Sequence, residues 1–299
     1  MRLLSSTGDP ELAMVHVAED NEGRRFEFVD SVQPPRPRSE KWVVIVSTMF
    51  GCPVGCRMCD AGGRPGGPID AEGILWQVDA AVRQRFPSGR PETGMLKVQF
   101  ARMGDPSLNP AVIEALDALP GRYPGTSVVA SVSTVGLVGS RRFLRGLREV
   151  KDRRYGQGRF QLQFSVHSTD PVARRELIPA RTMSLREMAA AGEAFRAPGD
   201  KRVTLNFCLI EGVPLDPAAV REAFDPEHFL VKLTPLNPTA SSRRWGLRSV
   251  VGPGTESRAD PIVAAFRAQG FETILSIGRY EENQIGSNCG LYLGANGDG

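Results

Sequence analysis

Short apolar segments alternate with longer stretches along most of the chain. Seven of these segments are rich in the β-branched and aromatic residues that favour strands. They lie near residues 42–48, 95–102, 127–134, 160–167, 203–210, 229–236 and 272–278. The pattern predicts a strand at each segment.

The stretches between these segments carry apolar residues at helical spacing. Apolar residues three or four positions apart lie on one face of a helix. The predicted helices cover residues 70–86, 110–119, 140–150, 184–195, 216–224 and 258–269. Strands that alternate with helices are typical of a parallel β/α sheet or barrel. The periodicity does not distinguish an open barrel from a doubly wound sheet.

The first 40 residues show a different pattern. Two strand-like segments, residues 12–18 and 24–32, are joined by the polar sequence EDNEGR, which predicts a β-hairpin. The sequence QPPRPRSE follows and is typical of a stiff linker. We therefore expect a hairpin extension and linker over residues 1–40 and a larger α/β domain over residues 41–295.

Composition limits the class of protein. The chain has 299 residues, of which 41% are hydrophobic, and a formal net charge of +3. No apolar run reaches the roughly 20 residues of a membrane span, and the N-terminus lacks the apolar stretch of a signal peptide. We therefore expect a cytoplasmic protein without a membrane partner. The weak net charge does not by itself indicate a nucleic-acid partner.

Three of the five cysteines lie close together. Cys52, Cys56 and Cys59 follow the first predicted strand of the α/β domain, in a glycine-rich loop. A structural zinc site has four ligands, so three cysteines leave it one ligand short. An iron–sulfur cubane with three thiolate ligands keeps one iron open for a substrate or cofactor. The sequence therefore predicts a cluster-binding loop, with zinc as the alternative.

The C-x-x-x-C-x-x-C spacing after the first strand resembles the radical S-adenosylmethionine (SAM) superfamily. Further segments resemble its RlmN/Cfr type, the adenine C-methyltransferases, in the same order along the chain: MGDPSLNP, SVSTVG, FSVHSTDPVARRELIP, VTLNFCLIEGVP, LTPLNP and GSNCGLYLG. The resemblance runs from about residue 40 to residue 295. It implies a partial (β/α)6 radical SAM barrel, a [4Fe–4S] cluster held by the three cysteines, and SAM at the open iron.

The resemblance also implies a set of SAM contacts. Gly104 and Asp105 would hold the amino group of SAM, with aspartate in place of the family's usual glutamate. The other implied contacts are Ser133, Ser165, Val166, His167 and Asn237. Two of these keep a structural alternative, because Ser133 could cap a helix and His167 could be a satisfied core histidine.

Two further positions match catalytic residues of the family. Cys289 corresponds to the cysteine that takes a methyl group from one SAM. A second SAM then makes the radical that activates this methyl, and the resulting methylene radical adds to an sp2 carbon of the substrate. Glu27 matches a substrate-contacting glutamate ahead of the cluster, and an exposed hairpin charge is the alternative.

The chain departs from the family pattern in two respects. Ile45 stands where the family has the cysteine that resolves the covalent adduct. Cys208 is the remaining cysteine, and a buried, inert thiol is the favoured interpretation. The helical N-terminal domain that RlmN and Cfr use against RNA has no counterpart, which favours a smaller substrate.

These patterns predict a radical SAM C-methyltransferase that passes a methyl or methylene carbon through Cys289 to an sp2 carbon of a small molecule. RNA is the alternative substrate, and an external electron donor such as a flavodoxin or ferredoxin is expected. Two other functions stay open. One is direct use of the 5'-deoxyadenosyl radical without methyl transfer, and the other is a non-catalytic zinc- or RNA-binding protein.

Overall fold

The computed structural model describes residues 1–63, 66–288 and 290. The strands form one sheet and are β1 (Arg2–Asp9), β2 (Ala13–Glu19), β3 (Arg25–Val32), β4 (Trp42–Val46), β5 (Met95–Phe100), β6 (Ser127–Thr134), β7 (Phe160–Ser165), β8 (Val203–Leu209), β9 (Phe229–Pro235) and β10 (Thr273–Leu275).

The helices lie between the strands from β4 onward and after β10. They are α1 (Ala71–Arg85), α2 (Ala111–Arg122), α3 (Arg141–Arg154), α4 (Pro171–Leu177), α5 (Leu185–Phe195), α6 (Pro217–Ala223), α7 (Ala240–Arg244), α8 (Asp260–Ala268) and α9 (Glu281–Ile285), with short 3-10 turns η1 (Pro106–Leu108) and η2 (Glu256–Ala259).

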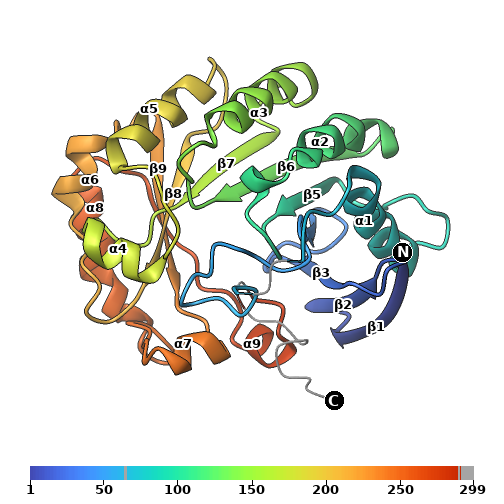
Figure 1. Ribbon diagram of the computed structural model, residues 1–299, viewed down its shortest axis with the longest axis horizontal. Coiled ribbons are helices and arrows are strands. Elements are labelled where there is room, and N and C mark those ends of the chain that lie inside the picture. Colours follow the sequence, from blue (N-terminus) through green and yellow to red (C-terminus); the bar gives the residue numbers. More distant parts are fainter. Residues whose placement is uncertain (64–65, 289, 291–299) are drawn as a thin grey trace.

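The sheet is an open, partial barrel. Its strands lie side by side in chain order, and those from β4 to β10 run parallel. Figure 1 shows the sheet curving, with α1, α2, α3, α5, α6 and α8 on its outside. The partial β/α barrel predicted from the sequence is therefore confirmed.

The predicted elements correspond closely to the observed ones. The seven predicted strands are β4 to β10, and the six predicted helices are α1, α2, α3, α5, α6 and α8. The sequence did not predict α4, α7 and α9. These helices have five to seven residues, a length at which a helical period is hard to recognise, although α6, which also has seven, was predicted.

The first strands continue the barrel sheet. The predicted hairpin is β2 and β3, and β3 also pairs antiparallel with β4, with Val29 opposite Ile45. The strand β1, which was not predicted, pairs with β2 at the edge of the sheet. Most of its side chains are exposed, so it lacks the alternation that marks a half-buried strand.

The main core lies between the outer face of the sheet and the helices. Along β5, Leu96, Val98 and Phe100 are buried in this core, whereas the alternate residues Lys97 and Gln99 are half-buried and face the inside of the barrel. The same alternation places polar residues of neighbouring strands on the inner face, among them Ser131, Gln161, Thr204 and Asn206. The inside of the barrel is therefore polar.

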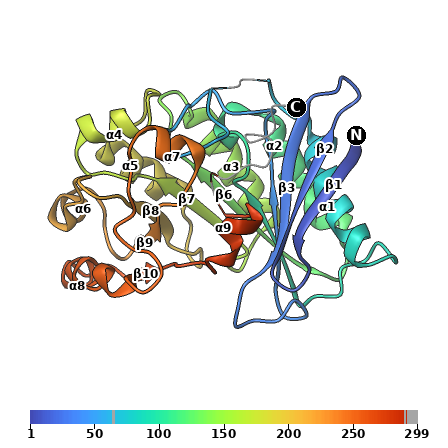
Figure 2. The same ribbon diagram turned by 90° about the horizontal axis from the view of Figure 1, so that it is seen from below.

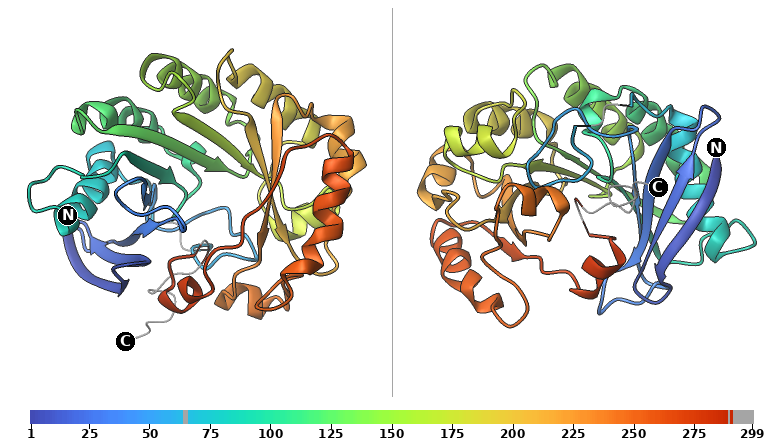
Figure 3. Two further views of the ribbon diagram at one scale, coloured as in Figure 1. Left: turned by 180° about the vertical axis from the view of Figure 1, so that it is seen from behind. Right: turned by 60° about the horizontal axis from the view of Figure 1, so that its bottom comes forward.

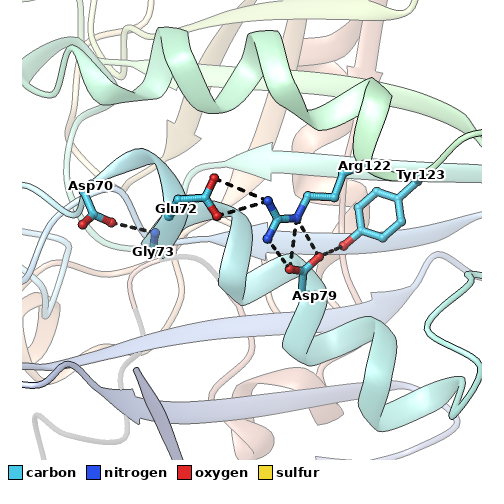
Figure 4. Close-up of polar contacts among 6 residues, drawn as sticks. All are labelled: Asp70, Glu72, Gly73, Asp79, Arg122 and Tyr123. Atoms are coloured by element: carbon cyan, nitrogen blue, oxygen red, sulfur yellow. Dashed lines mark hydrogen bonds and ion pairs between the residues drawn. The ribbon is translucent and has the colours of Figure 1, made fainter.

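Polar contacts fix the outer helices α1 and α2 to each other (Figure 4). The Arg122 guanidinium donates to Glu72 at 3.1 Å and to Asp79 at 2.7 Å. The Tyr123 hydroxyl donates to Asp79 at 2.6 Å, and burial together with this carboxylate raises the pKa of the phenol. The Arg122 side chain is one-third exposed, so each pair contributes about 1 kcal/mol or less.

Within the described ranges, none of the helices has both the length and the apolar character needed to cross a membrane.

Candidate active site

A long loop after β4 carries the three neighbouring cysteines. Both of its ends are held by buried side chains. The Gln77 amide oxygen accepts a hydrogen bond from the Ser47 N–H at 2.8 Å, and its amide nitrogen donates to the Ser47 carbonyl at 2.9 Å. The Asn109 amide donates to the carbonyls of Thr48 and Ile69, both at 2.7 Å. Figure 2 shows this blue-to-cyan loop along the same edge of the molecule as α4 and α7.

Backbone hydrogen bonds close the cysteine loop on itself. The Cys52 N–H donates to Ala61 O at 2.9 Å, and the Cys59 N–H donates to Cys56 O at 3.1 Å. The turn requires glycine at residue 62, because a Cβ there would lie 2.9 Å from the Cα of Gly55. The three cysteines are all half-buried in this loop.

An apolar group lies beside the cysteines. It consists of Val54, Val135, Leu137, Leu177, Ile178, Cys208, Ile210 and Leu236, with Cys52 and Cys56 packed against it. Burial and the nearby Asp105 carboxylate raise the pKa of the Cys52 thiol, although backbone N–H groups act in the opposite direction. A thiol in such a place ionises readily only when a metal binds it.

The donor set fits an iron–sulfur cluster. In the part of the chain that the structure describes, no three His, Cys, Asp or Glu side chains converge on the position of a single metal ion. A cubane is wider than one ion and takes soft thiolate ligands from a loop partly shielded from water. Cys52, Cys56 and Cys59 provide those ligands on one half-buried loop beside apolar side chains.

Gly104 and Asp105 lie after β5, against the start of the cysteine loop. Gly104 has a φ of +91°. The Asp105 carboxylate accepts hydrogen bonds from Ser107 N at 2.9 Å, from the Thr134 hydroxyl at 2.9 Å and from Val135 N at 2.8 Å. It thereby joins η1 to the end of β6. The carboxylate is buried and already satisfied by protein donors, so its contact with a SAM ammonium stays a prediction.

Gly104→Ala is expected to destabilise the protein by about 2–4 kcal/mol. The added Cβ would lie 2.5 Å from Met49 Cγ and 2.9 Å from Thr48 Oγ1, and alanine is strained at this φ. Gly125→Ala is the control, since residue 125 has a φ of +85° and no atom within 4 Å of a new Cβ. It should cost only about 1 kcal/mol of strain. Urea denaturation measures both, and equal losses would refute the steric clash.

The other implied SAM contacts lie at or near the same strand ends. Ser133 faces the barrel interior and accepts a hydrogen bond from Gln163 at 3.3 Å. Ser165 ends β7, and Asn237 follows β9 and is half-buried. The side chain of Val166 is buried in the main core, so only its backbone faces the site. None of these placements tests a SAM contact.

His167 adopts an unusual, left-handed conformation at the end of β7, with a φ of +63°. Its Nδ1 accepts a hydrogen bond from the Cys208 N–H at 3.1 Å. Burial and the positive charge of Arg174 lower the pKa of His167 to about 4. The imidazole is therefore neutral at pH 7, and its Nε2 carries a proton that it can donate.

Glu27 is buried in the barrel mouth rather than exposed on the hairpin. It is 4% exposed and pairs with Arg102, which is 5% exposed, at 2.8 Å. Arg102 in turn donates to the carbonyl oxygens of Gly286, Ser287 and Asn288 at 2.9, 3.2 and 3.2 Å. The pair thus holds the chain just before residue 289 over the end of β5. The exposed-charge interpretation of Glu27 was wrong.

Cys289 lies outside the described residues. The residues on both sides of it are described: Asn288 O accepts from Arg102, and Gly290 lies at the cysteine loop. Gly290 O accepts a hydrogen bond from Asp60 N at 2.9 Å, and a Cβ on residue 290 would lie 3.5 Å from Cys59 Cα. Helix α9, which leads to this segment, packs beside β1 and β2 (Figure 3), with Ile285 against Gly8.

Sequence reasoning missed Arg102 and Arg174. Arg174 is buried and donates to the carbonyls of Val166 and Val135 at 3.0 and 2.9 Å, which ties α4 to the ends of β6 and β7. Arg102 could have been found, since a charged residue at the C-terminal end of an apolar barrel strand indicates a site residue. Nothing in the sequence marks Arg174 as buried.

Cys208 is buried beside the cysteine loop, and Ile45 lies in a strand of the sheet. Cys208 is 8% exposed and lies in the apolar group beside the cysteine loop, where its Sγ lies 3.5 Å from Pro235 O. Ile45 lies within β4, opposite Val29 and Gln99. The predicted burial of Cys208 is confirmed, and an inert thiol there stays a prediction.

The fold and the cysteine loop together define a radical SAM barrel. A solved structure, "Crystal Structure of a radical SAM methyltransferase from Sphaerobacter thermophilus", superposes with a TM-score of 0.75 at 23% identity, covering 97% of this chain and 80% of that one. No protein-family model matches the chain.

Curated relatives carry the name RlmN. The "Probable dual-specificity RNA methyltransferase RlmN" of Synechococcus sp. (strain RCC307) is 32% identical over 213 residues, covering 68% of this chain and 58% of the relative. "Probable dual-specificity RNA methyltransferase RlmN 1" of Opitutus terrae (strain DSM 11246 / JCM 15787 / PB90-1) is 28% identical over 313 residues, covering 100% and 83%. The match to the first thus spans little more than half of its length. The chain is a homologue of RlmN-type proteins, and the predicted resemblance is confirmed.

Proposed function

We propose that this protein is a radical SAM methyltransferase that passes a methyl or methylene carbon through Cys289 to an sp2 carbon. One observation carries the proposal. The segments on both sides of residue 289 are hydrogen-bonded at the barrel mouth, to Arg102 on one side and to Asp60, next to Cys59, on the other. These contacts support the proposal that Cys289 acts beside the loop that carries the three cysteines.

The residues of the barrel mouth have separate tasks in this proposal. Cys52, Cys56 and Cys59 hold a [4Fe–4S] cluster, which supplies the electron that cleaves SAM when both are bound. The backbone of Gly104 is a proposed SAM contact, and the packing of the loop requires glycine there because a Cβ would lie 2.5 Å from Met49 Cγ. The proposed SAM contacts are Asp105 after β5 and residues at the ends of β6, β7 and β9, with His167 and Asn237 among them.

Cys289 provides covalent catalysis. A thiolate attacks the methyl carbon of SAM, the bond from this carbon to the SAM sulfur breaks, and S-adenosylhomocysteine leaves. The methyl is then held at a fixed place beside the substrate. This divides the alkylation of an electron-poor ring carbon into steps with lower barriers. Glu27 acts indirectly, because its carboxylate orients Arg102, which holds the segment before Cys289.

The proposed acceptor is a small molecule that enters the polar inside of the barrel. RNA is the second candidate, and the names of the curated relatives favour it. An external one-electron donor of the flavodoxin or ferredoxin class is part of the proposal. A cytoplasmic location, expected from the sequence, stays a prediction.

Mass spectrometry of protein incubated without oxygen with methyl-deuterated SAM tests the proposal. We expect a labelled methyl group on the peptide that contains Cys289. Cys289→Ala should carry no label there, whereas Cys208→Ala should label like the native chain. Full 5'-deoxyadenosine formation with Cys289 never labelled would instead support direct use of the radical. RNA and a pool of metabolites are then added in separate reactions. The acceptor that becomes labelled with deuterium decides between the two substrate classes.

A further inference from the structure

An exposed tryptophan is stacked against an arginine of the cysteine loop. The guanidinium carbon of Arg57 lies 4.0 Å from the centre of the Trp245 ring. Arg57 directly follows Cys56, and Trp245 directly follows α7 and is 51% exposed. Three further exposed arginines are near Trp245 in the chain, at Arg243, Arg244 and Arg248. These three arginines, Arg57 and Trp245 are called the arginine face below.

Hydrogen bonds fix α7 to the cysteine loop. The Asp60 carboxylate accepts from two backbone N–H groups at the start of α7, at 2.8 and 3.2 Å. The Thr239 hydroxyl donates to Met58 O at 3.1 Å. These contacts lie on both sides of Cys59, since Met58 precedes it and Asp60 follows it. The arginine face therefore lies beside the part of the loop that carries two of the proposed cluster ligands.

A structural role alone does not account for the exposure of Trp245. Helix α7 is already held to the loop by the three hydrogen bonds, and about half of the indole surface stays in water. An exposed indole forgoes much of the hydrophobic stabilisation that its burial would give. The cation–π contact with Arg57 favours one orientation of the ring. Trp and Arg are the residues most enriched among those that dominate protein–protein binding.

The surface around this stack is positively charged. Residues 237–250 contain three arginines and no Asp or Glu. Arg248 pairs with Glu211 at 3.9 Å, and its side chain is still 83% exposed. Helix α4 lies along the same edge of the molecule as α7 in Figure 2, and the Arg57 N–H donates to the carbonyl at its end at 2.9 Å. The exposed charged residues on the α4 side are Arg175, Glu176 and Arg181. The arginines outnumber the carboxylates along this edge, which suits a negatively charged partner.

We propose that the arginine face is the docking site of an acidic protein that carries one electron, of the flavodoxin or ferredoxin class. This inference rests on the proposed function, because reductive cleavage of SAM requires an electron from outside the chain. The reduced carrier passes one electron to the cluster, so the carrier is oxidised and the cluster is reduced. Carboxylates of the carrier pair with the arginines, and the exposed indole packs against the carrier surface.

Calorimetric titration with oxidised flavodoxin and, separately, with oxidised ferredoxin tests the docking site. We expect at least one of these acidic carriers to bind the native chain. Arg244→Glu should weaken that binding about tenfold or more, because the reversed charge repels the carrier. Trp245→Ala should weaken it by a similar factor. The proposal is overturned if neither carrier binds, or if both variants bind as tightly as the native chain.

Arg90→Glu is the matched control for the charge reversal. Arg90 is exposed and lies in the loop before β5, at the opposite end of the strands from the cysteine loop. The variant changes the net charge by the same amount as Arg244→Glu, so it should keep the affinity within about twofold. A loss as large as that of Arg244→Glu would show that net charge alone governs binding and would overturn the docking site.

Formation of 5'-deoxyadenosine with two different reductants gives a second readout. With sodium dithionite, which needs no docking surface, Arg244→Glu and Trp245→Ala should cleave SAM within about twofold of the native rate. With the reduced carrier they should be slower by about tenfold or more. Equal losses with both reductants would contradict a docking role. A native chain that binds the carrier but leaves SAM intact with dithionite would overturn the proposed function, whereas the titrations would still support the docking site.

Salt and RNA identify the kind of partner. Binding through exposed charges should weaken as the salt concentration rises from about 50 to about 300 mM. A short single-stranded RNA is the competing ligand, since arginines and an exposed aromatic ring also suit nucleic acid. RNA that binds more tightly than both carriers, and that loses this affinity in Arg244→Glu, would assign the face to RNA and overturn the proposal. RNA binding that Arg244→Glu leaves unchanged would support it.

Discussion

Replacing Cys52, Cys56 or Cys59 with alanine is expected to remove the cluster and with it all cleavage of SAM. The native chain, reconstituted without oxygen, should hold about four iron atoms, and each variant close to none. The reason is geometric. The three thiols lie on one loop closed by backbone hydrogen bonds, and two ligands do not hold a cubane against exchange with solvent thiols. Iron and sulfide analysis and the yield of 5'-deoxyadenosine measure the effect.

Cys208→Ala is the control for this series. Cys208 is buried beside the cysteine loop, and its substitution removes a thiol of the same size near the same site. This variant should keep its iron and cleave SAM at close to the native rate. If it lost iron as completely as Cys56→Ala, the assignment of the three cluster ligands would be wrong.

Arg102→Met is expected to destabilise the fold by about 3–5 kcal/mol and to slow methylation of Cys289. The substitution removes the Arg102 cation from its pair with the buried Glu27 carboxylate, and it removes the donor to the carbonyls of residues 286–288. Glu27→Gln should cost less, about 1–3 kcal/mol, because a neutral amide can still accept from Arg102. Urea denaturation and the rate of label transfer to Cys289 measure the two effects.

The double variant Arg102→Met with Glu27→Gln separates charge burial from positioning. It no longer buries the Glu27 charge in the absence of Arg102, so it should recover part of the stability that Arg102→Met loses. It still lacks the donor to residues 286–288, so methylation of Cys289 should stay slow. Amide exchange in that segment should be faster in both variants that lack Arg102. Arg186→Met breaks an exposed pair and should cost about 1 kcal/mol or less. Native-like methylation in the double variant would contradict the positioning role.

Most of the fold could be predicted from the sequence. The strands of the barrel are buried on the helix side, and their outer residues are apolar, many of them β-branched or aromatic. The longer helices show their period over two or more turns. By contrast, β1 is exposed and α7 and α9 are single turns, so neither alternation nor helical period marks them. Their positions depend on contacts with residues that are distant in the sequence.

The candidate site was less predictable than the fold. The three cysteines and Gly104 are recognisable in the sequence because a thiol indicates metal-binding chemistry and a glycine indicates an unusual backbone conformation. The partner of Glu27 was not recognisable. Arg102 is 75 residues away in the chain, and only the pairing of β3 with β4 and of β4 with β5 brings the two side chains together. Interactions between distant residues of this kind have no local pattern.

The motif around Asp105 did not predict the contacts that its carboxylate makes within the protein. Its place in MGDPSLNP suggested a ligand for the SAM amino group, and the structure shows its carboxylate bonded to Ser107, Thr134 and Val135. The shorter side chain thus fixes the turn after β5 to the end of β6. A role in holding SAM stays a prediction, and it requires the ammonium to bind a carboxylate that protein donors already surround.

The most direct test of the account is reduction of the anaerobically reconstituted protein in the presence of SAM. We expect the protein to bind about four iron and four sulfide per chain, its electron paramagnetic resonance spectrum to change when SAM is added, and 5'-deoxyadenosine to form. A chain that holds no iron and sulfide, or that holds them and leaves SAM intact under strong reduction, would contradict it.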